Sequence, residues 1–146
     1  LGDFDTTGLT SVNLAEQKEY CEKIMYVKQN QVTPEHYHDK KKEDIICRIG
    51  SLALQFFSEE PIVKLQVNGE FQDLPVSRLL ILQAGERVTL TQGIRHAFWA
   101  ESEYAIVGEV STANDDTNDN FFQNPQVGRF SEIIEDEPAI AKLVSE

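Results

Sequence analysis

The chain has 146 residues, with 25 Asp and Glu against 13 Lys and Arg, and a formal net charge of -12. This length suits one domain, which we predict over residues 1–146. The acidic field repels polyanions, so neither nucleic acid nor an anionic membrane surface is an expected partner. No apolar run reaches membrane-spanning length, and Cys21 and Cys47 are too few for a disulfide framework. A cytoplasmic protein with reduced thiols is therefore expected.

The predicted elements are β-strands, because short β-branched or aromatic runs alternate with turn residues between Tyr20 and Val110. This pattern is typical of an all-β sandwich or barrel. Asn68 and Gly69 give the strongest hairpin signal, since both tolerate positive φ. In chain order, the expected strands are residues 22–28, 32–38, 44–50, 52–57, 62–67, 78–82, 87–91, 96–100 and 104–110, with a turn at 83–86, a polar loop at 111–120 and a short helix within 131–146.

Four residues have the types and spacing of metal ligands. His36 and His38 are two apart, so on a strand their side chains leave the same face. The polar residues 39–42 suit a bend, after which Glu43 begins a strand expected to run beside the first. His96 is expected to reach the site from a neighbouring strand. Three nitrogens and one oxygen leave two positions open on an octahedral divalent cation.

The spacing of these residues is similar to the two motifs of the cupin superfamily. His36, His38, Glu43 and Gly50 match the first motif, and Gly85, Gly93 and His96 match the second, whereas Asn30, Thr91 and Ala100 depart from the motifs without removing a ligand. Scattered surface or core histidines are the competing explanation, but all three histidines of the chain fall on ligand positions. The resemblance implies an all-β cupin double-stranded β-helix, a jelly-roll barrel, with short terminal extensions.

More of the chain resembles the D-lyxose ketol-isomerase family. The resemblance is carried by residues 28–34, 41–46, 108–112, 114–116, 119–120, 128–130 and 135–138. It implies a manganese-dependent aldose–ketose isomerase, usually dimeric, that interconverts D-lyxose and D-xylulose and often D-mannose and D-fructose. Cys47, Ile49, Arg95 and Phe121 depart from the family pattern, which leaves the sugar preference open. Family members also carry a longer segment before Leu1, so the chain is expected to be short at its N-terminus.

Isomerisation moves one proton between adjacent carbons and another between their oxygens. Glu109, expected on a strand beside the His96 strand, is the predicted proton carrier, and Lys41 is predicted to bind a sugar oxygen or to stabilise enediolate charge. In the competing explanation, Glu109 is a solvent-exposed residue on a strand, and Lys41 is an outward-facing residue in a turn. Further predicted sugar contacts are Gln31, Asp115, Asp119 and Arg129; the aspartates are equally suited to capping loop turns.

Two other functions are compatible with the sequence. Three His and one Glu also bind the metal of oxygen-using cupins, although Lys41 and the polar loop after Glu109 suit a polyol better than an apolar substrate. A sugar-binding cupin without turnover is the third possibility. Mn²⁺ is the expected cofactor, but the ligand types also suit Fe, Co, Ni and Zn.

Overall fold

The computed structural model describes residues 9–124 and 127. Every regular element in these residues is a β-strand, which confirms the all-β prediction. The strands are β1 (Thr10–Glu16), β2 (Tyr20–Lys28), β3 (His36–Tyr37), β4 (Glu43–Ile49), β5 (Ser51–Phe57), β6 (Ile62–Val67), β7 (Glu70–Pro75), β8 (Leu80–Gln83), β9 (Arg87–Leu90), β10 (Arg95–Ala100), β11 (Tyr104–Thr112) and β12 (Phe121–Phe122).

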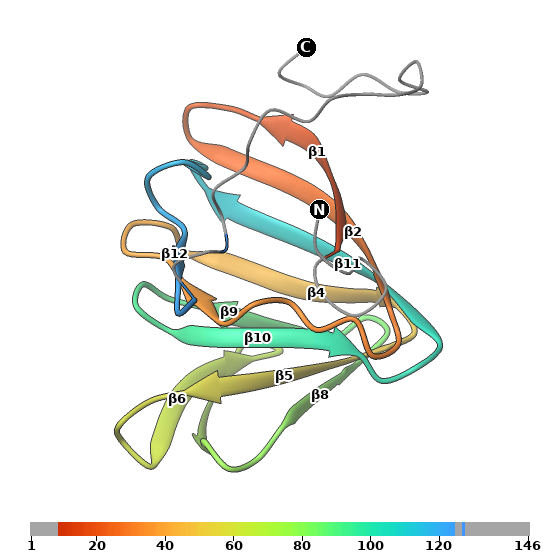
Figure 1. The fold of residues 1–146 in the computed structure, drawn as a ribbon, viewed down its shortest axis with the longest axis vertical. Helices are drawn as coiled ribbons and strands as arrows, with labels where there is room; N and C mark the ends of the chain where they lie inside the picture. The colour runs from red at the N-terminus through yellow and green to blue at the C-terminus, as the bar shows by residue number, and fades with distance from the viewer. Residues whose placement is uncertain (1–8, 125–126, 128–146) are drawn as a thin grey trace.

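The strands form two sheets. One has seven strands in the order β1-β2-β11-β4-β9-β6-β7, and the other has five in the order β12-β3-β10-β5-β8. Figure 1 shows β1, β2, β11 and β4 in one layer and β10, β5 and β8 in the other. All strand pairs within the sheets are antiparallel, and apolar side chains from both sheets fill the space between them. This is the layered arrangement of a jelly roll.

The inner face of the seven-stranded sheet changes from apolar to polar along its strands. On β11 the inward residues run from Val107 to Glu109 and Ser111, and on β4 they run from Ile45 to Glu43. Glu43 and Ser111 are register partners, so the polar ends of the two strands coincide. Burying a polar group costs free energy unless a partner satisfies it. The polar end is therefore where a functional site is expected.

The local turn predictions are confirmed. Asn68 and Gly69 have φ values of 52° and 91° and join β6 to β7 with Val67 opposite Glu70. The turn at residues 83–86 is closed by the Glu86 N–H, which donates to the Gln83 carbonyl at 2.9 Å.

Two predictions about the ligand-bearing strands are wrong. The strand expected over residues 32–38 is regular only at His36–Tyr37. Before it, Val32 forms an isolated bridge and the Thr33 N–H donates to the Phe98 carbonyl at 3.0 Å, and Pro34, which has no N–H to donate, interrupts the ladder. The strand that begins at Glu43 does not run beside β3. Instead, β3 pairs with β10 and β12 in the smaller sheet, and β4 pairs with β11 and β9 in the larger one. The bend at residues 39–42 therefore crosses from one sheet to the other.

Three strands of the structure, β1, β7 and β12, were not among the expected strands, although the Asn68-Gly69 hairpin signal implied a partner for β6. All three lie at the outer edges of their sheets, where the inside–outside alternation is weakest. The helix expected within residues 131–146 lies outside the described residues. Within residues 9–124 and 127, there is no helix long and apolar enough to cross a membrane.

Candidate functional site

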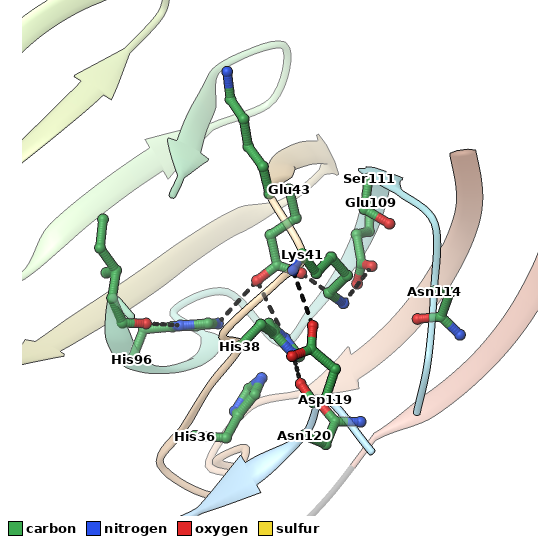
Figure 2. A network of polar contacts seen from close by, with 12 residues as sticks. His36, His38, Lys41, Glu43, His96, Glu109, Ser111, Asn114, Asp119 and Asn120 are labelled. Carbon is green, nitrogen blue, oxygen red and sulfur yellow. Dashed lines mark hydrogen bonds and ion pairs between the residues drawn. The ribbon is translucent and has the colours of Figure 1, made fainter. Parts of the chain in front are cut away.

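The four predicted ligands lie together at the polar end of the space between the sheets (Figure 2). His36 on β3 stands directly opposite His96 on β10, and their ring centroids are 4.4 Å apart. His38 follows β3, with its ring centroid 5.2 Å from that of His36 and 6.4 Å from that of His96. Glu43 is the first residue of β4 and points toward the histidines from the other sheet.

Three atoms at the centre of this group are buried and have no hydrogen-bond partner among the described residues: His38 Nε2, His96 Nε2 and Glu43 Oε1. Glu43 Oε1 lies 3.6 Å from the first and 3.5 Å from the second. In the described part of the chain, no three His, Cys, Asp or Glu side chains lie close enough together to coordinate one metal ion without moving. Buried polar atoms without partners are rare, however, and binding of an ion is one of their recognised explanations.

The tautomer of each ring is set by a main-chain carbonyl. Because a carbonyl oxygen only accepts hydrogen bonds, each Nδ1 must carry the hydrogen, and the Nε2 of the neutral ring keeps its lone pair. Burial lowers the pKa of His36 to about 4 and also lowers the pKa values of His38 and His96, so all three are neutral at pH 7. The Nδ1–carbonyl distances are 2.9 Å from His36 to Pro34, 2.5 Å from His38 to Asp119 and 3.0 Å from His96 to Ile94.

Lys41 lies between two buried carboxylates. Its Nζ is 2.8 Å from Glu43 Oε2 and 2.9 Å from Glu109 Oε1, and all three side chains are buried. Burial alone would lower the pKa of Lys41, but the charges of Glu43 and Glu109 outweigh it and raise that pKa. Burial likewise pushes the pKa of Glu43 up, and the positive charge of Lys41 overcomes it and brings the pKa below its usual range. The result is a buried Glu–Lys–Glu triad in which Lys41 and Glu43 are ionised at neutral pH.

The expected position of Glu109 needs correction. Its strand, β11, runs between β2 and β4 in the larger sheet and does not lie beside β10, which belongs to the smaller sheet. Glu109 nevertheless faces the site from across the barrel, because β11 and β10 belong to opposing sheets and Glu109 is on the inner face.

The other predicted sugar contacts have different positions. The Asp119 carboxylate is buried and accepts hydrogen bonds from the main-chain N–H groups of Asp39 and Lys41. Asp115 accepts hydrogen bonds from the main chain and side chain of Asn118, both at 3.0 Å, as a loop cap does. Gln31 is fully buried, and its Oε1 accepts from the Lys28 N–H at 3.0 Å. Arg129 lies outside the described residues. Binding of a sugar by any of these four stays a prediction.

Sequence reasoning missed Lys23. This residue lies on the inner face of β2, opposite Glu109 in the register with β11. Its Nζ is 3.0 Å from Asn114 Oδ1 and 3.1 Å from Asp116 Oδ1. A signal was present, because Lys23 alternates with buried Cys21 and Met25 along a predicted strand, and a lysine on the inner face requires a partner.

A cavity of about 490 Å³ opens beside His36. Charged and amide side chains make up much of its wall, together with aromatic ones from β12. The lining includes Glu35, His36, Arg95, Asp116, Asn120 and Phe122. Arg95 pairs with Glu35 and also donates to Gln123 Oε1 at 2.8 Å.

A family model described as D-lyxose isomerase matches residues 2–146. The chain belongs to the D-lyxose isomerase family. A protein of Serratia proteamaculans named D-lyxose/D-mannose isomerase is 40% identical, over 93% of this chain and 67% of its own length. A protein of Escherichia coli O157:H7 with the same name is also 40% identical, over 87% of this chain and 60% of its own length. The predicted family resemblance is thereby confirmed.

Solved structures agree on the fold of this D-lyxose isomerase family member. The L-ribose isomerase of Acinetobacter sp. DL28 in complex with L-ribose superposes with a TM-score of 0.66 at 17% identity, over 84% of this chain and 74% of that one. A cupin-2 domain protein from Shewanella frigidimarina NCIMB 400 gives a TM-score of 0.50 at 21% identity, over 69% of this chain and 78% of that one. At these identities the likeness establishes the fold, and it confirms the cupin jelly roll.

Proposed function

We propose that the chain is a metal-dependent aldose–ketose isomerase that interconverts D-lyxose and D-xylulose, and also D-mannose and D-fructose. Family membership and the names of the two relatives support the reaction class and the sugars. The observation that carries the metal dependence is the convergence of two buried imidazole nitrogens and a carboxylate oxygen, none with a hydrogen-bond partner in the described residues.

His36, His38, Glu43 and His96 would hold the cation. The fit rests on the chemistry of the donors: three neutral imidazoles whose Nε2 lone pairs are fixed by Nδ1–carbonyl bonds, and one ionised carboxylate. Mn²⁺ is the proposed ion, and Fe, Co, Ni and Zn accept the same donor types. When bound, such a cation polarises the sugar carbonyl and acidifies the adjacent hydroxyl.

Glu109 is the proposed proton carrier. Its carboxylate takes the hydrogen of the aldose C2 as a proton, and the electrons of that C–H bond form the double bond of an enediol. The same proton returns to C1, and a second proton passes between the two oxygens, so the aldose and ketose have the same composition. Glu109 binds Lys41 through Oε1, and we therefore assign Oε2 to the sugar.

Lys41 is the proposed electrostatic partner of this step. Its ammonium is buried and lies between Glu43 and Glu109. A fixed positive charge at this position stabilises negative charge that develops on the sugar oxygens, and it costs little reorganisation because the ion pairs already hold it in place. Lys41 also holds the Glu109 carboxylate in place, because its Nζ lies 2.9 Å from Glu109 Oε1.

The sugar is proposed to enter through the cavity beside His36. Its volume of about 490 Å³ suits a pentose or hexose, and its wall carries the hydrogen-bonding side chains that hydroxyl groups need. Asp116 and Asn120 line the cavity, and both belong to the polar loop that follows β11. A homodimer, expected from the family resemblance, and a cytoplasmic location, expected from the two reduced cysteines, belong to the same proposal.

The test is an anaerobic incubation of the purified chain with Mn²⁺, in which D-lyxose and D-mannose are each followed by chromatography. Ketose formation without oxygen, abolished by EDTA, is the expected result. Turnover that requires oxygen would assign the chain to oxygen-dependent cupins, and bound sugar without conversion would make it a binding protein.

Glu109→Gln tests the proton carrier. This variant keeps the shape of the side chain and is expected to bind Mn²⁺ as the wild type does while losing turnover by about 10²- to 10⁴-fold, the usual contribution of a general base. Glu70→Gln is the matched control, because Glu70 is exposed on β7. A near-normal rate in Glu109→Gln would remove Glu109 from the mechanism.

A further inference from the structure

Asp119 forms an unusual contact with the bend between two of the proposed ligands. The bend comprises residues 39–41, immediately after His38 and shortly before Glu43. The N–H groups of Asp39, Lys40 and Lys41 all donate to the Asp119 carboxylate: the first two reach Oδ1 at 3.0 Å, and the third reaches Oδ2 at 2.9 Å. Three successive main-chain N–H groups that converge on one anion hold the backbone of the bend in a single conformation.

Asp119 also sets the tautomer and orientation of the His38 ring. The main-chain carbonyl of Asp119 accepts the hydrogen bond from His38 Nδ1 at 2.5 Å (Figure 2). Asp119 is 3% exposed, so water does not compete freely for either contact. One residue thus fixes both the backbone on which His38 sits and the tautomer of its imidazole.

Asp119 is itself held by its loop. Its N–H donates to the Asp115 carbonyl at 2.9 Å. The start of the loop is bound to β2, because Lys23 Nζ contacts both Asn114 and Asp116. The loop is therefore anchored to the larger sheet at one end and to His38 at the other.

We infer that Asp119 is a positioning residue that holds His38 as the Nδ1–H tautomer and, through this, sets the affinity of the site for a divalent cation. This inference rests on the proposed function for the presence of the cation, but the tautomer is a property of the metal-free chain. The role differs from the sugar contact expected from the sequence, since the carboxylate oxygens are directed at main-chain amides.

The first test needs only the metal-free wild type. Long-range ¹H–¹⁵N NMR distinguishes a protonated Nδ1 from a protonated Nε2 for each histidine, and the three histidines can be assigned by single His→Gln variants. His38 is expected to show a protonated Nδ1. A protonated Nε2 on His38 would overturn the inference whatever the chain does with metal or sugar.

The second test compares Asp119→Asn with Asp39→Asn. The amide of Asp119→Asn places an NH₂ group against main-chain donors, so the bend and the His38 ring lose their fixed arrangement. Asp39→Asn removes one negative charge from the bend itself but keeps the Asp39 N–H and the Asp119 carboxylate that accepts from it. Mn²⁺ titration by calorimetry is expected to give an affinity loss of about 10- to 100-fold for Asp119→Asn, the usual effect of removing a partner that orients a ligand, and little change for Asp39→Asn.

The outcomes separate the inference from the proposed function. If the wild type binds no Mn²⁺, the proposed function fails, and the NMR result alone judges the tautomer. If the wild type binds Mn²⁺ and Asp119→Asn binds it equally well, with His38 still protonated at Nδ1, Asp119 is not the positioning residue. Urea unfolding of both metal-free variants establishes that the titrations are made on folded protein.

Discussion

Replacing Lys41 by methionine removes the only charge that the structure places between Glu43 and Glu109 in the described part of the chain. Methionine has nearly the same length but no ammonium, so the volume is kept. In the metal-free protein, Glu43 and Glu109 both lose the ammonium group that they contact. Both carboxylates lie within 2.9 Å of the Lys41 Nζ and are buried, so water cannot replace the lost partner.

The expected cost is large. Removing one partner of a buried ion pair costs about 3–5 kcal/mol, because a buried charge is left without compensation. A domain is stable by about 5–15 kcal/mol in total, so Lys41→Met should lose a substantial fraction of the folding free energy. Lys40→Met is the matched control, since Lys40 is exposed, and it should change stability by less than about 0.5 kcal/mol.

Urea unfolding in EDTA at pH 7.5, followed by the fluorescence of Trp99, measures these differences. The double variant Lys41→Met with Glu109→Gln should be more stable than Lys41→Met alone, because one of the two uncompensated carboxylates is gone. Lys41→Met should also bind Mn²⁺ more tightly than the wild type, since a positive charge next to Glu43 has been removed. A loss below about 1 kcal/mol in Lys41→Met would refute the buried triad.

Three further predictions follow from the site and the fold. The metal-free protein should lose stability as the pH falls from 6.5 to 4, because His36 binds a proton in the unfolded chain but stays neutral in the folded chain, where its pKa is about 4. His36 alone accounts for at most about 3 kcal/mol of the free energy of unfolding, and urea midpoints at pH 7.5 and 5 measure the loss. Gly50→Ala should cost more than about 1 kcal/mol in the same assay, since Gly50 has φ +79° and a Cβ there would lie 2.4 Å from a main-chain oxygen, whereas Gly108→Ala should cost less because only a flexible arginine must move. His96→Ala should lose tightly bound Mn²⁺ in elemental analysis; a full equivalent retained after desalting would exclude His96 as a ligand.

Local signals in the sequence predicted the fold class, and they also predicted that the four proposed ligands lie close together. The Asn68-Gly69 turn depends on two residues that tolerate positive φ, and its hairpin is in the structure. The His-x-His spacing of His36 and His38 is visible within three residues of the sequence, and in the structure both rings lie close to the ring of His96. In each case the information lies in residue types at short range.

Strand partners were harder to predict because they depend on the whole chain. The bend after His38 has the composition of a hairpin turn, yet in the structure it connects β3 in one sheet to β4 in the other. No local sequence pattern distinguishes a hairpin turn from a connection between sheets. For the same reason, Glu109 was expected beside the wrong strand, although its inward orientation follows from the alternation along β11.

The role of Asp119 has no sequence signal of its own. Its contacts are to main-chain N–H groups and, through its own carbonyl, to His38. Every residue has a carbonyl and nearly every residue has an N–H, so residue types do not reveal such contacts. In contrast, Lys23 could have been found from its position between buried residues on β2.

The most direct test of the account is to titrate Mn²⁺ into the metal-free chain while the rate of D-xylulose formation from D-lyxose is measured without oxygen. The rate should rise from zero and level off at one Mn²⁺ per chain, and the His96→Ala variant should stay inactive over the same range. Full activity before any metal is added, or a saturated metal site with no D-xylulose, would contradict the account.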